Sequence, residues 1–367
     1  MSSTTDQLPI DPRPVGEILA GELEARGWTQ ADFAAVLGRP TQFVSEIITG
    51  KKEITRESAA QIGAALDQTP ESWLRLQDQY LLAEQAKSVD TQQKLSDVRR
   101  RALLNAKAPI ALLQKRGALK GRTLDEIEAE VLELFEIDSL DAEPAFDLAA
   151  RRSNGDEAIS PLQNAWVACV RREARTATPS SGFSADGLRR LGSTLPRTLT
   201  EPHHFRGLPD AFARVGVRLV YVEALPGAKI DGCAMLVDGV PVIGISGRGK
   251  RLDKVLFTLL HETAHLVLGH VNDNHYIVES TDDDPGSGAP ESANEQAANE
   301  EAAGWLLPSG LPSTPTRITA PWLDQVARGL GVAPIVVVGQ LQKRRLLDWR
   351  TTLARNAPTV SDVLAAW

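Results

Sequence analysis

The first 80 residues repeat one pattern, a short amphipathic stripe followed by a turn. Apolar side chains recur three and four positions apart within each stripe, which is the spacing of one helix face. Gly27, Gly38 and Gly50 separate the stripes, and Thr29 and Thr55 are residues that cap helix N-termini well. The pattern predicts five short helices around one core, over residues 15–26, 29–37, 41–49, 55–66 and 70–80.

Beyond residue 80 the pattern becomes mixed. Residues 83–107 suit one long polar helix, and amphipathic stripes follow at 109–117 and 123–135. Asp238-Gly239 is a strong hairpin signal between two apolar runs. Three strands are predicted, over residues 217–222, 233–237 and 240–246. The predicted fold class is therefore mainly α with a small β-sheet (α+β).

A chain of 367 residues is longer than one hydrophobic core usually covers, so more than one domain is expected. The N-terminal helices predict a helical domain over residues 1–82, and the polar helices after them predict a helical connector over residues 83–184. Residues 176–184 are rich in Thr, Pro, Ser and Gly, which indicates a flexible boundary. The strands and apolar helices that follow predict a C-terminal domain over residues 185–367.

The net charge of −8 argues against binding nucleic acid through overall charge, so any DNA contact must come from a local patch. Cys169 and Cys233 are too few for a disulfide framework and fit a reducing compartment. No apolar run is long enough to cross a membrane, and the first residues lack a signal-peptide pattern. These features predict a cytoplasmic protein without a membrane partner.

Residues 30–52 place two helices on either side of a tight turn at Gly38, and the second helix is short and polar on its outer face. This is the layout of a helix-turn-helix, whose second helix enters the major groove of DNA. The candidate contacts to base edges are Thr41, Gln42, Ser45 and Glu46. The candidate contacts to phosphates are Gln30, Arg39, Lys51 and Lys52.

The words GWTQADFA (27–34), VSEI (44–47) and GKKEIT (50–55) resemble the lambda-repressor-like, HigA-type antitoxin family. The resemblance covers about residues 12–85 and implies a domain that binds a double-stranded DNA operator, with a cognate toxin as a partner. A homodimer is expected. Residues 1–80 hold seven Lys or Arg against twelve Asp or Glu, so a helical docking or dimerisation module is the alternative.

A second candidate site lies in Leu259–Leu268, an apolar stretch that contains an HExxH motif. On a helix, His261 and His265 share one face, so both imidazoles can reach one metal ion. Glu262 then stands beside the ion as a base. Such a motif also arises by chance, but the surrounding leucines favour a buried helix, with Asp253 as its N-cap and Gly269 at its end.

A third ligand is expected from a helix that packs on the first, and residues 291–308 fit because their alanines allow close approach. Glu295 is the predicted ligand, and Asn299 is expected to orient a histidine. Glu291 is the alternative ligand. Glu300 and Glu301 are interpreted as ordinary surface charges. Stabilisation of an oxyanion is a candidate role for three residues after the motif, His270, His275 and Tyr276.

The words LLHETAH (259–265), EQAAN (295–299) and LLP (306–308) are similar to motifs of the ImmA/IrrE family of zinc metallopeptidases. The resemblance implies a zincin-like C-terminal domain, Zn2+ or Mn2+ at the three predicted ligands, and endopeptidase activity with Glu262 as the catalytic base. Two departures are Glu301, where that family usually has an aromatic residue, and a proline one position closer to the leucines.

Two functions from different classes follow from these motifs. In the first, the chain is a transcriptional regulator with a zinc-dependent endopeptidase domain that cleaves a partner repressor or toxin. In the second, it is an antitoxin-like repressor or toxin-binding scaffold whose metal site is structural or sensory. The intact Glu262 favours the first function, because a structural zinc site needs no base. The HigA-like N-terminal part favours the second.

Overall fold

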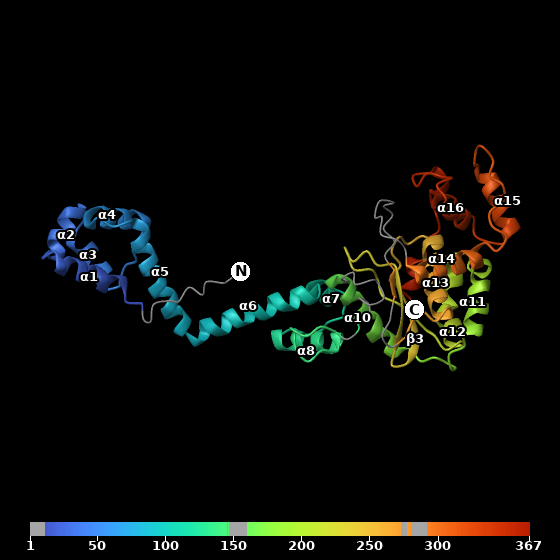
Figure 1. The fold of residues 1–367 in the computed structure, drawn as a ribbon, viewed down its shortest axis with the longest axis horizontal. Coiled ribbons are helices and arrows are strands. Elements are labelled where there is room, and N and C mark those ends of the chain that lie inside the picture. The colour runs from blue at the N-terminus through green and yellow to red at the C-terminus, as the bar shows by residue number, and fades with distance from the viewer. Residues whose placement is uncertain (1–11, 145, 147–159, 273–276, 280–291) are drawn as a thin grey trace. The chain divides into compact units, whose positions relative to one another are not determined.

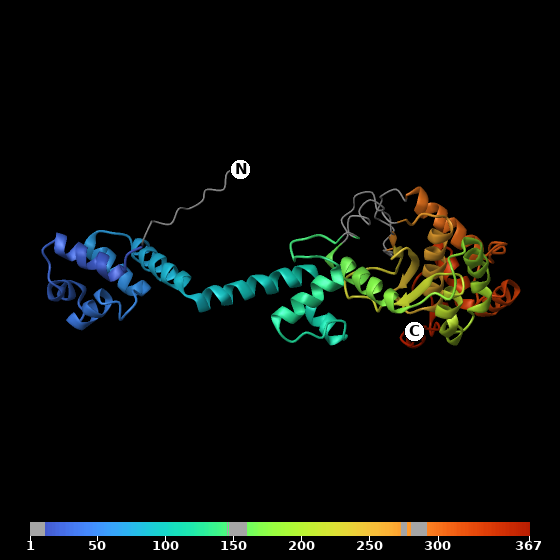
Figure 2. The ribbon, with the colours of Figure 1, turned by 90° about the horizontal axis from the view of Figure 1, so that it is seen from below.

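The computed structural model describes residues 12–144, 146, 160–272, 277–279 and 292–367 (Figures 1 and 2). It divides into two compact units, Met1–Arg100 and Arg101–Trp367, and hydrophobic cores are present in both. The structure is mostly helical with one small sheet, which confirms the predicted mixture of α-helices and a minor β-sheet. Among the described helices, none combines the length and the apolar character needed to cross a bilayer.

The first unit contains the five predicted helices, packed around one hydrophobic core. Thr29 caps the second helix and forms a capping box with Asp32, and Thr55 caps the fourth helix in the same way. Gly38 ends the second helix in the left-handed conformation, at φ 65°. The helices are α1 (Val15–Ala25), α2 (Gln30–Leu37), α3 (Thr41–Ile48), α4 (Arg56–Leu66) and α5 (Pro70–Lys87).

The polar stretch after residue 82 forms two helices rather than the single helix predicted over residues 83–107. α5 continues to Lys87, Ser88 takes an extended conformation, and α6 (Val89–Lys107) begins after it. The Ser88 hydroxyl accepts a hydrogen bond from the Thr91 amide at 3.4 Å, as a capping serine does. The predicted helix is interrupted because this local hydrogen bond competes with the helical backbone pattern.

The second unit contains the other helices. The stripes at 109–117 and 123–135 form α7 (Ile110–Lys115) and α8 (Leu124–Phe135), as predicted. The remaining described helices are α10 (Pro161–Thr176), α11 (Ala185–Thr198), η1 (Pro202–Gly207), α12 (Leu208–Ala213), α13 (Leu252–Val267), α14 (Ala293–Leu306), α15 (Ala320–Leu330), α16 (Pro334–Lys343), η2 (Thr352–Ala354) and α17 (Ser361–Leu364).

Four short strands form one mixed sheet in the order β1-β3-β2-β4. β1 runs parallel to β3, whereas β2 runs antiparallel to both of its neighbours. Asp238 (φ 54°) and Gly239 (φ 74°) join β2 to β3, which confirms the predicted hairpin. The strands are β1 (Arg218–Tyr221), β2 (Gly232–Val237), β3 (Val240–Ile245) and β4 (Ile277–Glu279). The first three confirm the prediction, and β4 was not predicted.

The sheet carries helices on both faces, because successive side chains of a strand point to opposite sides. Along β2, Cys233, Met235 and Val237 join the core that includes α10, whereas Ala234 joins the core that includes α13. Figures 1 and 2 accordingly show the sheet between α10 and α13. The helix with the HExxH motif therefore rests on one face of the sheet.

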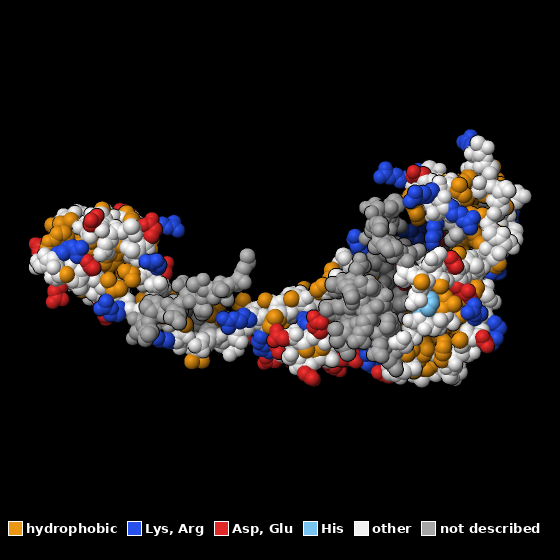
Figure 3. Space-filling model, in the orientation of Figure 1, with side chains coloured by type: hydrophobic (Ala, Val, Ile, Leu, Met, Phe, Trp, Pro, Cys, Tyr) orange, Lys and Arg blue, Asp and Glu red, His pale blue; other side chains and the backbone are white. Residues whose placement is uncertain are grey.

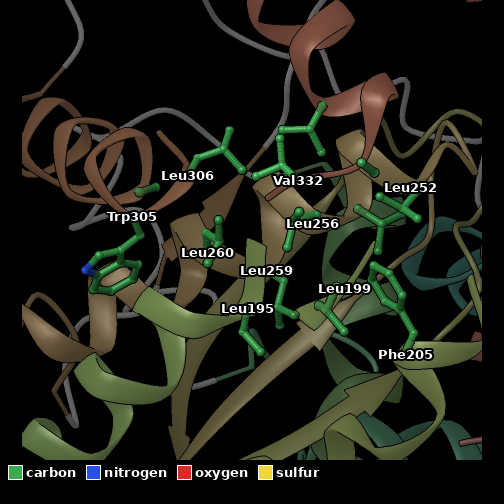
Figure 4. Packing of buried hydrophobic residues seen from close by; sticks show 14 of the residues in the cluster. Leu195, Leu199, Phe205, Leu252, Leu256, Leu259, Leu260, Trp305, Leu306 and Val332 are labelled. Carbon is green, nitrogen blue, oxygen red and sulfur yellow. The ribbon is translucent and has the colours of Figure 1, made fainter. Parts of the chain in front are cut away.

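α13 lies at the centre of the larger core, between α11, α14 and the segment after α15 (Figure 4). The leucines that it contributes include Leu252, Leu256, Leu259 and Leu260. Arg251 is the N-cap, so the prediction that Asp253 caps this helix was wrong. Asp253 instead accepts two hydrogen bonds from the Arg251 guanidinium, at 3.0 and 2.6 Å. Gly269 follows the helix end with φ 72°, as expected.

Residues 176–184, interpreted as a flexible boundary, are tied to the fold by backbone hydrogen bonds. The Ser180 amide donates to the Ala213 carbonyl at 3.0 Å, and the Ser184 amide donates to the Val215 carbonyl at 3.1 Å. α10, which precedes this segment, shares a core with the sheet that follows it. The structure thus groups residues 101–367 together, whereas the sequence pattern divided the chain at residues 82 and 184.

Candidate metal centre and nucleic-acid interface

The two histidines of the motif face each other on α13. His261 and His265 are completely buried, and their Nε2 atoms lie 2.8 Å apart. Their ring centroids are 4.5 Å apart. The four-residue spacing produces this arrangement, because residues four apart lie one above the other on a helix face.

α14 brings the predicted third side chain to the same point. Ser292 caps the helix by accepting the Glu295 amide, and the buried Ala298 and Ala302 let α14 approach α13 closely. The Glu295 carboxylate lies 3.2 Å from His261 Nε2 and 3.4 Å from His265 Nε2. Among the described residues, these three form the group of His, Cys, Asp and Glu side chains whose ligand atoms converge, all within 4.8 Å of one another.

A polar side chain contacts the outer nitrogen of each imidazole. Asn299 Oδ1, one turn after Glu295 on α14, lies 3.2 Å from His261 Nδ1. His270 Nδ1 lies 3.0 Å from His265 Nδ1. His270 was considered for oxyanion stabilisation, but the structure places its ring against the second histidine of the motif. Outer partners of this kind hold the orientation of an imidazole ligand.

Glu262 is completely buried, and its carboxylate lies against the start of β2. A Cβ added at Gly232 would lie only 2.8 Å from Glu262 Oε1 and 2.7 Å from the Thr258 methyl group. Glycine at position 232 thus leaves the room that the Glu262 side chain occupies. Burial, together with the charge of Glu262, raises the pKa of the neighbouring Cys233 thiol well above its usual range.

Burial and hydrogen bonding shift the pKa values of the ionisable groups at this site in opposite directions. Burial alone would raise the pKa of Glu295, but hydrogen bonds and positive charge from His261 and His265 hold it well below its usual range. Burial lowers the pKa of His265 and of His270. The ionised form of the Glu295 carboxylate is therefore favoured.

The other acidic residues of this helix have different surroundings. Glu300 is exposed, as interpreted, whereas Glu301 pairs with Arg189 of α11. That ion pair joins two helices of the same core, so Glu301 is more than an isolated surface charge. Three residues considered from the sequence, Glu291, His275 and Tyr276, lie outside the described residues.

The candidate nucleic-acid interface consists of α2, the turn at Gly38 and α3. Thr41 and Gln42 are exposed at the start of α3, and Ser45 and Glu46 are partly exposed one turn later. Val44 and Ile47 of the same helix are buried in the core. The helix thus places the four predicted base-contacting side chains outside the core. Gln42 Nε2 donates to Glu46 Oε1 at 2.8 Å, so both side chains already share a hydrogen bond.

The basic side chains near the turn are organised by an aromatic ring that the sequence analysis did not identify. The Phe43 ring centroid lies 5.4 Å from the Arg39 guanidinium and 4.9 Å from Lys52 Nζ. Arg39 also pairs with Glu57 and donates to Gln61 Oε1 at 3.2 Å. The remaining predicted phosphate contacts, Gln30 and Lys51, are exposed.

Comparison with known proteins agrees with this part of the structure. A protein-family model described as "Helix-turn-helix" matches residues 20–74. The uncharacterized HTH-type transcriptional regulator YddM of Escherichia coli is 33% identical over 79 residues, which are 22% of this chain and 83% of that protein. An uncharacterized HTH-type transcriptional regulator of Haemophilus influenzae is 35% identical over 89 residues, or 24% of this chain and 83% of that protein.

The chain therefore belongs to the helix-turn-helix family of transcriptional regulators, and its first unit is a DNA-binding module. Solved structures with similarity include a HigA-family antidote protein from Coxiella burnetii (33% identity, 24% of this chain, 94% of that chain, TM-score 0.22). An antidote protein of a plasmid maintenance system from Nostoc punctiforme is 31% identical (24% and 96% covered, TM-score 0.22). The antitoxin GraA is 32% identical (21% and 83% covered, TM-score 0.20).

Proposed function

We propose that this helix-turn-helix regulator carries, in its second unit, the site of a zinc-dependent endopeptidase that cleaves a protein partner. The observation that carries the proposal is the convergence of His261, His265 and Glu295 beside the buried Glu262. Two imidazoles and one carboxylate are the protein ligands of a well-known class of catalytic zinc sites, which keep a fourth position for water or substrate.

The residues fit such an ion by chemistry and, for Glu295, by distance. Ligand atoms roughly 2.0–2.2 Å from a tetrahedral ion lie roughly 3.3–3.6 Å from one another. The Glu295 oxygens lie 3.2 and 3.4 Å from the two Nε2 atoms, close to this range. The two Nε2 atoms lie 2.8 Å apart, so the imidazoles would move apart slightly to hold the ion. Asn299 Oδ1 lies against His261 Nδ1, so the tautomer with its hydrogen on Nδ1 would donate to this oxygen and leave the Nε2 lone pair for the ion. Mn2+ is the alternative ion for the same ligands.

The number of ligands favours a catalytic site over a structural one. Structural zinc sites use four protein ligands, whereas catalytic sites use three. In the part of the chain that the structure describes, the converging group has three members. Glu262, next to the group and on the same helix, adds a carboxylate that a structural site does not need.

Different residues of the chain then have different roles in amide hydrolysis. A bound zinc ion supplies a Lewis acid and lowers the pKa of water. Glu262 takes a proton from the attacking water onto its carboxylate and later delivers it to the leaving amine. Asn299 and His270 hold the two imidazoles in orientation. The packing of α13 against β2 keeps Glu262 buried, which excludes competing solvent.

The experiment that tests the peptidase is Glu262→Gln, an isosteric change that removes the base. General acid-base catalysis contributes about 100- to 10,000-fold, so cleavage should fall by about that factor while metal content stays near one ion per chain. Cleavage is measured by mass spectrometry on a proteome-derived peptide library, and metal by elemental analysis. Glu300→Gln, exposed on α14, is the matched control and should cleave normally. Equal cleavage by wild type and Glu262→Gln would exclude this mechanism.

For the first unit we propose a homodimer on an inverted repeat, with half-sites one helical turn apart. Gln42→Ala should relax sequence preference, because Gln42 is exposed at the start of α3. Lys51→Ala should weaken binding to all sequences and reduce the salt dependence by about one unit of slope. Selection from random DNA measures the sequence preference, and binding titrations at several salt concentrations measure the salt dependence. Failure to enrich any sequence would instead favour a docking or dimerisation module.

The second candidate function is an antitoxin-like repressor or toxin-binding scaffold with a structural or sensory metal site. The resemblance of residues 27–55 to HigA-type antitoxins favours it. Wild type and Glu262→Gln separate the two functions, because a scaffold does not use the base. Identical behaviour of both proteins, in cleavage and in repression in cells, would leave the binding role.

A further inference from the structure

The Phe43 ring lies between two cations at opposite ends of α3. Its centroid is 5.4 Å from the central carbon of the Arg39 guanidinium and 4.9 Å from Lys52 Nζ. Arg39 comes before α3, in the turn at Gly38, and Lys52 comes after the helix has ended. One ring therefore contacts cations from both ends of the helix that is proposed to enter the major groove of DNA.

Phe43 lies at the border between the outer face and the core face of α3. Successive residues of a helix are turned by about 100°, which places Phe43 between the outer Gln42 and Glu46 and the buried Val44 and Ile47. The ring is partly buried and packs against the core of the first unit. In a helix that reads base edges with its outer face, the flanks face the phosphates at the edges of the groove. The ring and its two cations therefore lie on a flank suited to phosphate contact.

Each of these cations also has a carboxylate partner. Arg39 pairs with Glu57 of α4 and donates to Gln61 Oε1 at 3.2 Å. Lys52 Nζ lies 4.0 Å from Glu46 Oε2. The Glu57 side chain is 74% exposed and the Lys52 side chain is 45% exposed, and ion pairs in solvent contribute little to stability. A DNA phosphate can therefore replace either carboxylate at a small cost in free energy.

The first unit has few cations with which to bind a polyanion. Residues 1–80 hold seven Lys or Arg against twelve Asp or Glu. In the view of Figure 3, blue Lys and Arg side chains of this unit are interspersed with red Asp and Glu side chains. The overall charge of this part does not attract DNA, so the position of each cation that contacts a phosphate matters more.

An aromatic ring is a suitable group to position a cation for DNA. Long Lys and Arg side chains lose rotamer freedom when a contact fixes them, and this loss weakens binding. A ring that already holds the cation reduces the loss, and it leaves the positive charge intact because the ring itself is uncharged. Since Arg39 and Lys52 contact the same ring, they are also close enough to reach neighbouring phosphates of one DNA strand.

We propose that Phe43 is a positioning residue for DNA binding, whose ring holds Arg39 and Lys52 as a clamp for neighbouring phosphates of one strand. Without DNA, Glu57 and Glu46 pair with the two cations, and in the complex phosphates replace these carboxylates. The inference rests on the proposed contact of α3 with DNA. It adds the group that orients the phosphate contacts and the carboxylates that compete for them.

A double-mutant cycle on the full-length chain tests the clamp, with binding to a fluorescein-labelled DNA duplex of mixed sequence measured by anisotropy at low salt. Phe43→Leu keeps an apolar side chain against the core but removes the ring, and it should weaken binding about fivefold or more. In the Arg39→Met/Lys52→Met background the same change should weaken binding less than about twofold, because no cation is left to position. Phe43→Tyr keeps the ring and should bind like the wild type.

A second pair of variants tests the clamp without changing the core. Glu57→Gln removes the carboxylate that competes for Arg39, whereas Glu24→Gln removes the same charge from an exposed position on α1. Glu57→Gln should tighten duplex binding about twofold more than Glu24→Gln does. This difference should disappear when Arg39→Met is added to both variants.

The outcomes distinguish the clamp from DNA binding itself. An equal loss from Phe43→Leu in both backgrounds would show a packing role alone and would overturn the clamp while DNA binding stands. Equal tightening by Glu57→Gln and Glu24→Gln would overturn the competition between carboxylate and phosphate, since only general charge repulsion would remain. If the wild type binds no duplex even at low salt, the proposed contact of α3 with DNA is overturned, and the clamp with it.

Discussion

The candidate nucleic-acid interface and the candidate metal centre are built in opposite ways. All the candidate DNA contacts lie between Gln30 and Lys52, on α2, α3 and the turns that follow them, and neighbouring residues determine the start of α2 and the turn at Gly38. The metal centre instead joins two helices, and His261 meets Asn299, which lies 38 residues further along the chain. The geometry of a local motif is determined by neighbouring residues, whereas the geometry of a site between helices depends on how the whole core packs.

Added Zn2+ should change the stability of the two units very differently. The first 100 residues contain no His or Cys, whereas the proposed ligands all lie in the second unit. Zn2+ at about 1,000 times its Kd should raise the free energy of unfolding of the second unit by about 4 kcal/mol. The first unit should not respond. Hydrogen exchange with mass spectrometry, followed in peptides from α13 and from α2, measures both effects in one sample.

The control for this prediction is the chain with Glu295→Ala, which removes one ligand and keeps α14 helical because alanine favours helices. Its α13 peptides should lose most of the zinc response. If this variant and the wild type gain equal protection, the ion binds elsewhere, and the contrast between the two sites would no longer hold.

The sequence pointed to the residues of the candidate metal centre but not to all of their surroundings. The histidine spacing and the alanines of residues 291–308 favoured His261, His265 and Glu295, with Glu291 as the alternative, and the structure brings the first three together. The contact between His265 and His270 could not be predicted, because it depends on how the chain turns after Gly269. Whether these residues hold an ion stays a prediction.

At the nucleic-acid interface the missed feature is the Phe43 ring. The sequence pattern gave this ring no role, and the structure places it beside Arg39 and Lys52. Arg39 lies about one helical turn before Phe43 and could have revealed half of this contact, whereas Lys52 lies beyond the end of α3 and reaches the ring only through the fold. The five helices of this unit were predicted because their caps and turns are local, and Thr29, Gly38 and Thr55 act where the pattern placed them.

Even the local unit depends on close packing at one point that the periodicity does not reveal. A Cβ at Gly16 on α1 would collide with the backbone carbonyl oxygens of Ile47 and Ile48 at the end of α3. Gly16→Ala should therefore destabilise the first unit by on the order of 3 kcal/mol, the upper end of the usual cost of overpacking. Thermal or urea unfolding, resolved by hydrogen exchange in α3 peptides, measures the loss.

Gly21 provides a matched control on the same helix. A Cβ added there meets no atom within 4 Å, so Gly21→Ala should stabilise the unit by about 0.5–1 kcal/mol through helix propensity. The two substitutions should change the free energy of unfolding in opposite directions, although both replace glycine with alanine. Equal effects would mean that α1 does not rest on the end of α3 in this way, and that helix propensity alone governs this unit.

The fold of the second unit was predicted less completely, because its connections are long-range. α8 and the β2–β3 hairpin were both predicted, but their relation through α10 was not. Glu136, at the end of α8, accepts hydrogen bonds from Arg171 at 3.0 and 3.1 Å and from Arg175 at 2.9 Å. Arg175 also donates to Asp238 in the hairpin turn, at 3.0 and 3.3 Å. This network joins the predicted connector to the predicted C-terminal domain.

The smallest predicted effect is the pH dependence of the stability that this network around Glu136 contributes. Burial alone would raise the pKa of Glu136, but the hydrogen bonds and charges of Arg171 and Arg175 lower it from 4.5 to about 2. The folded state therefore favours the ionised carboxylate. The resulting stabilisation is complete above pH 4.5 and is lost as the pH falls towards about 2. Because the Glu136 side chain is 37% exposed, solvent screening reduces the expected contribution at pH 7 to about 1 kcal/mol.

Glu136→Gln should remove this contribution, and the difference in unfolding free energy between variant and wild type should shrink as the pH falls from 5 to 2. Glu133→Gln, at an exposed position of the same helix, is the matched control and should change stability little at either pH. Hydrogen exchange in peptides from α8 and from the β2–β3 hairpin should change together, because Arg175 contacts both ends of the network. A loss of protection confined to α8 would show that residues 83–184 behave as a separate connector, as the sequence pattern predicted, and that the junction contributes no shared stability.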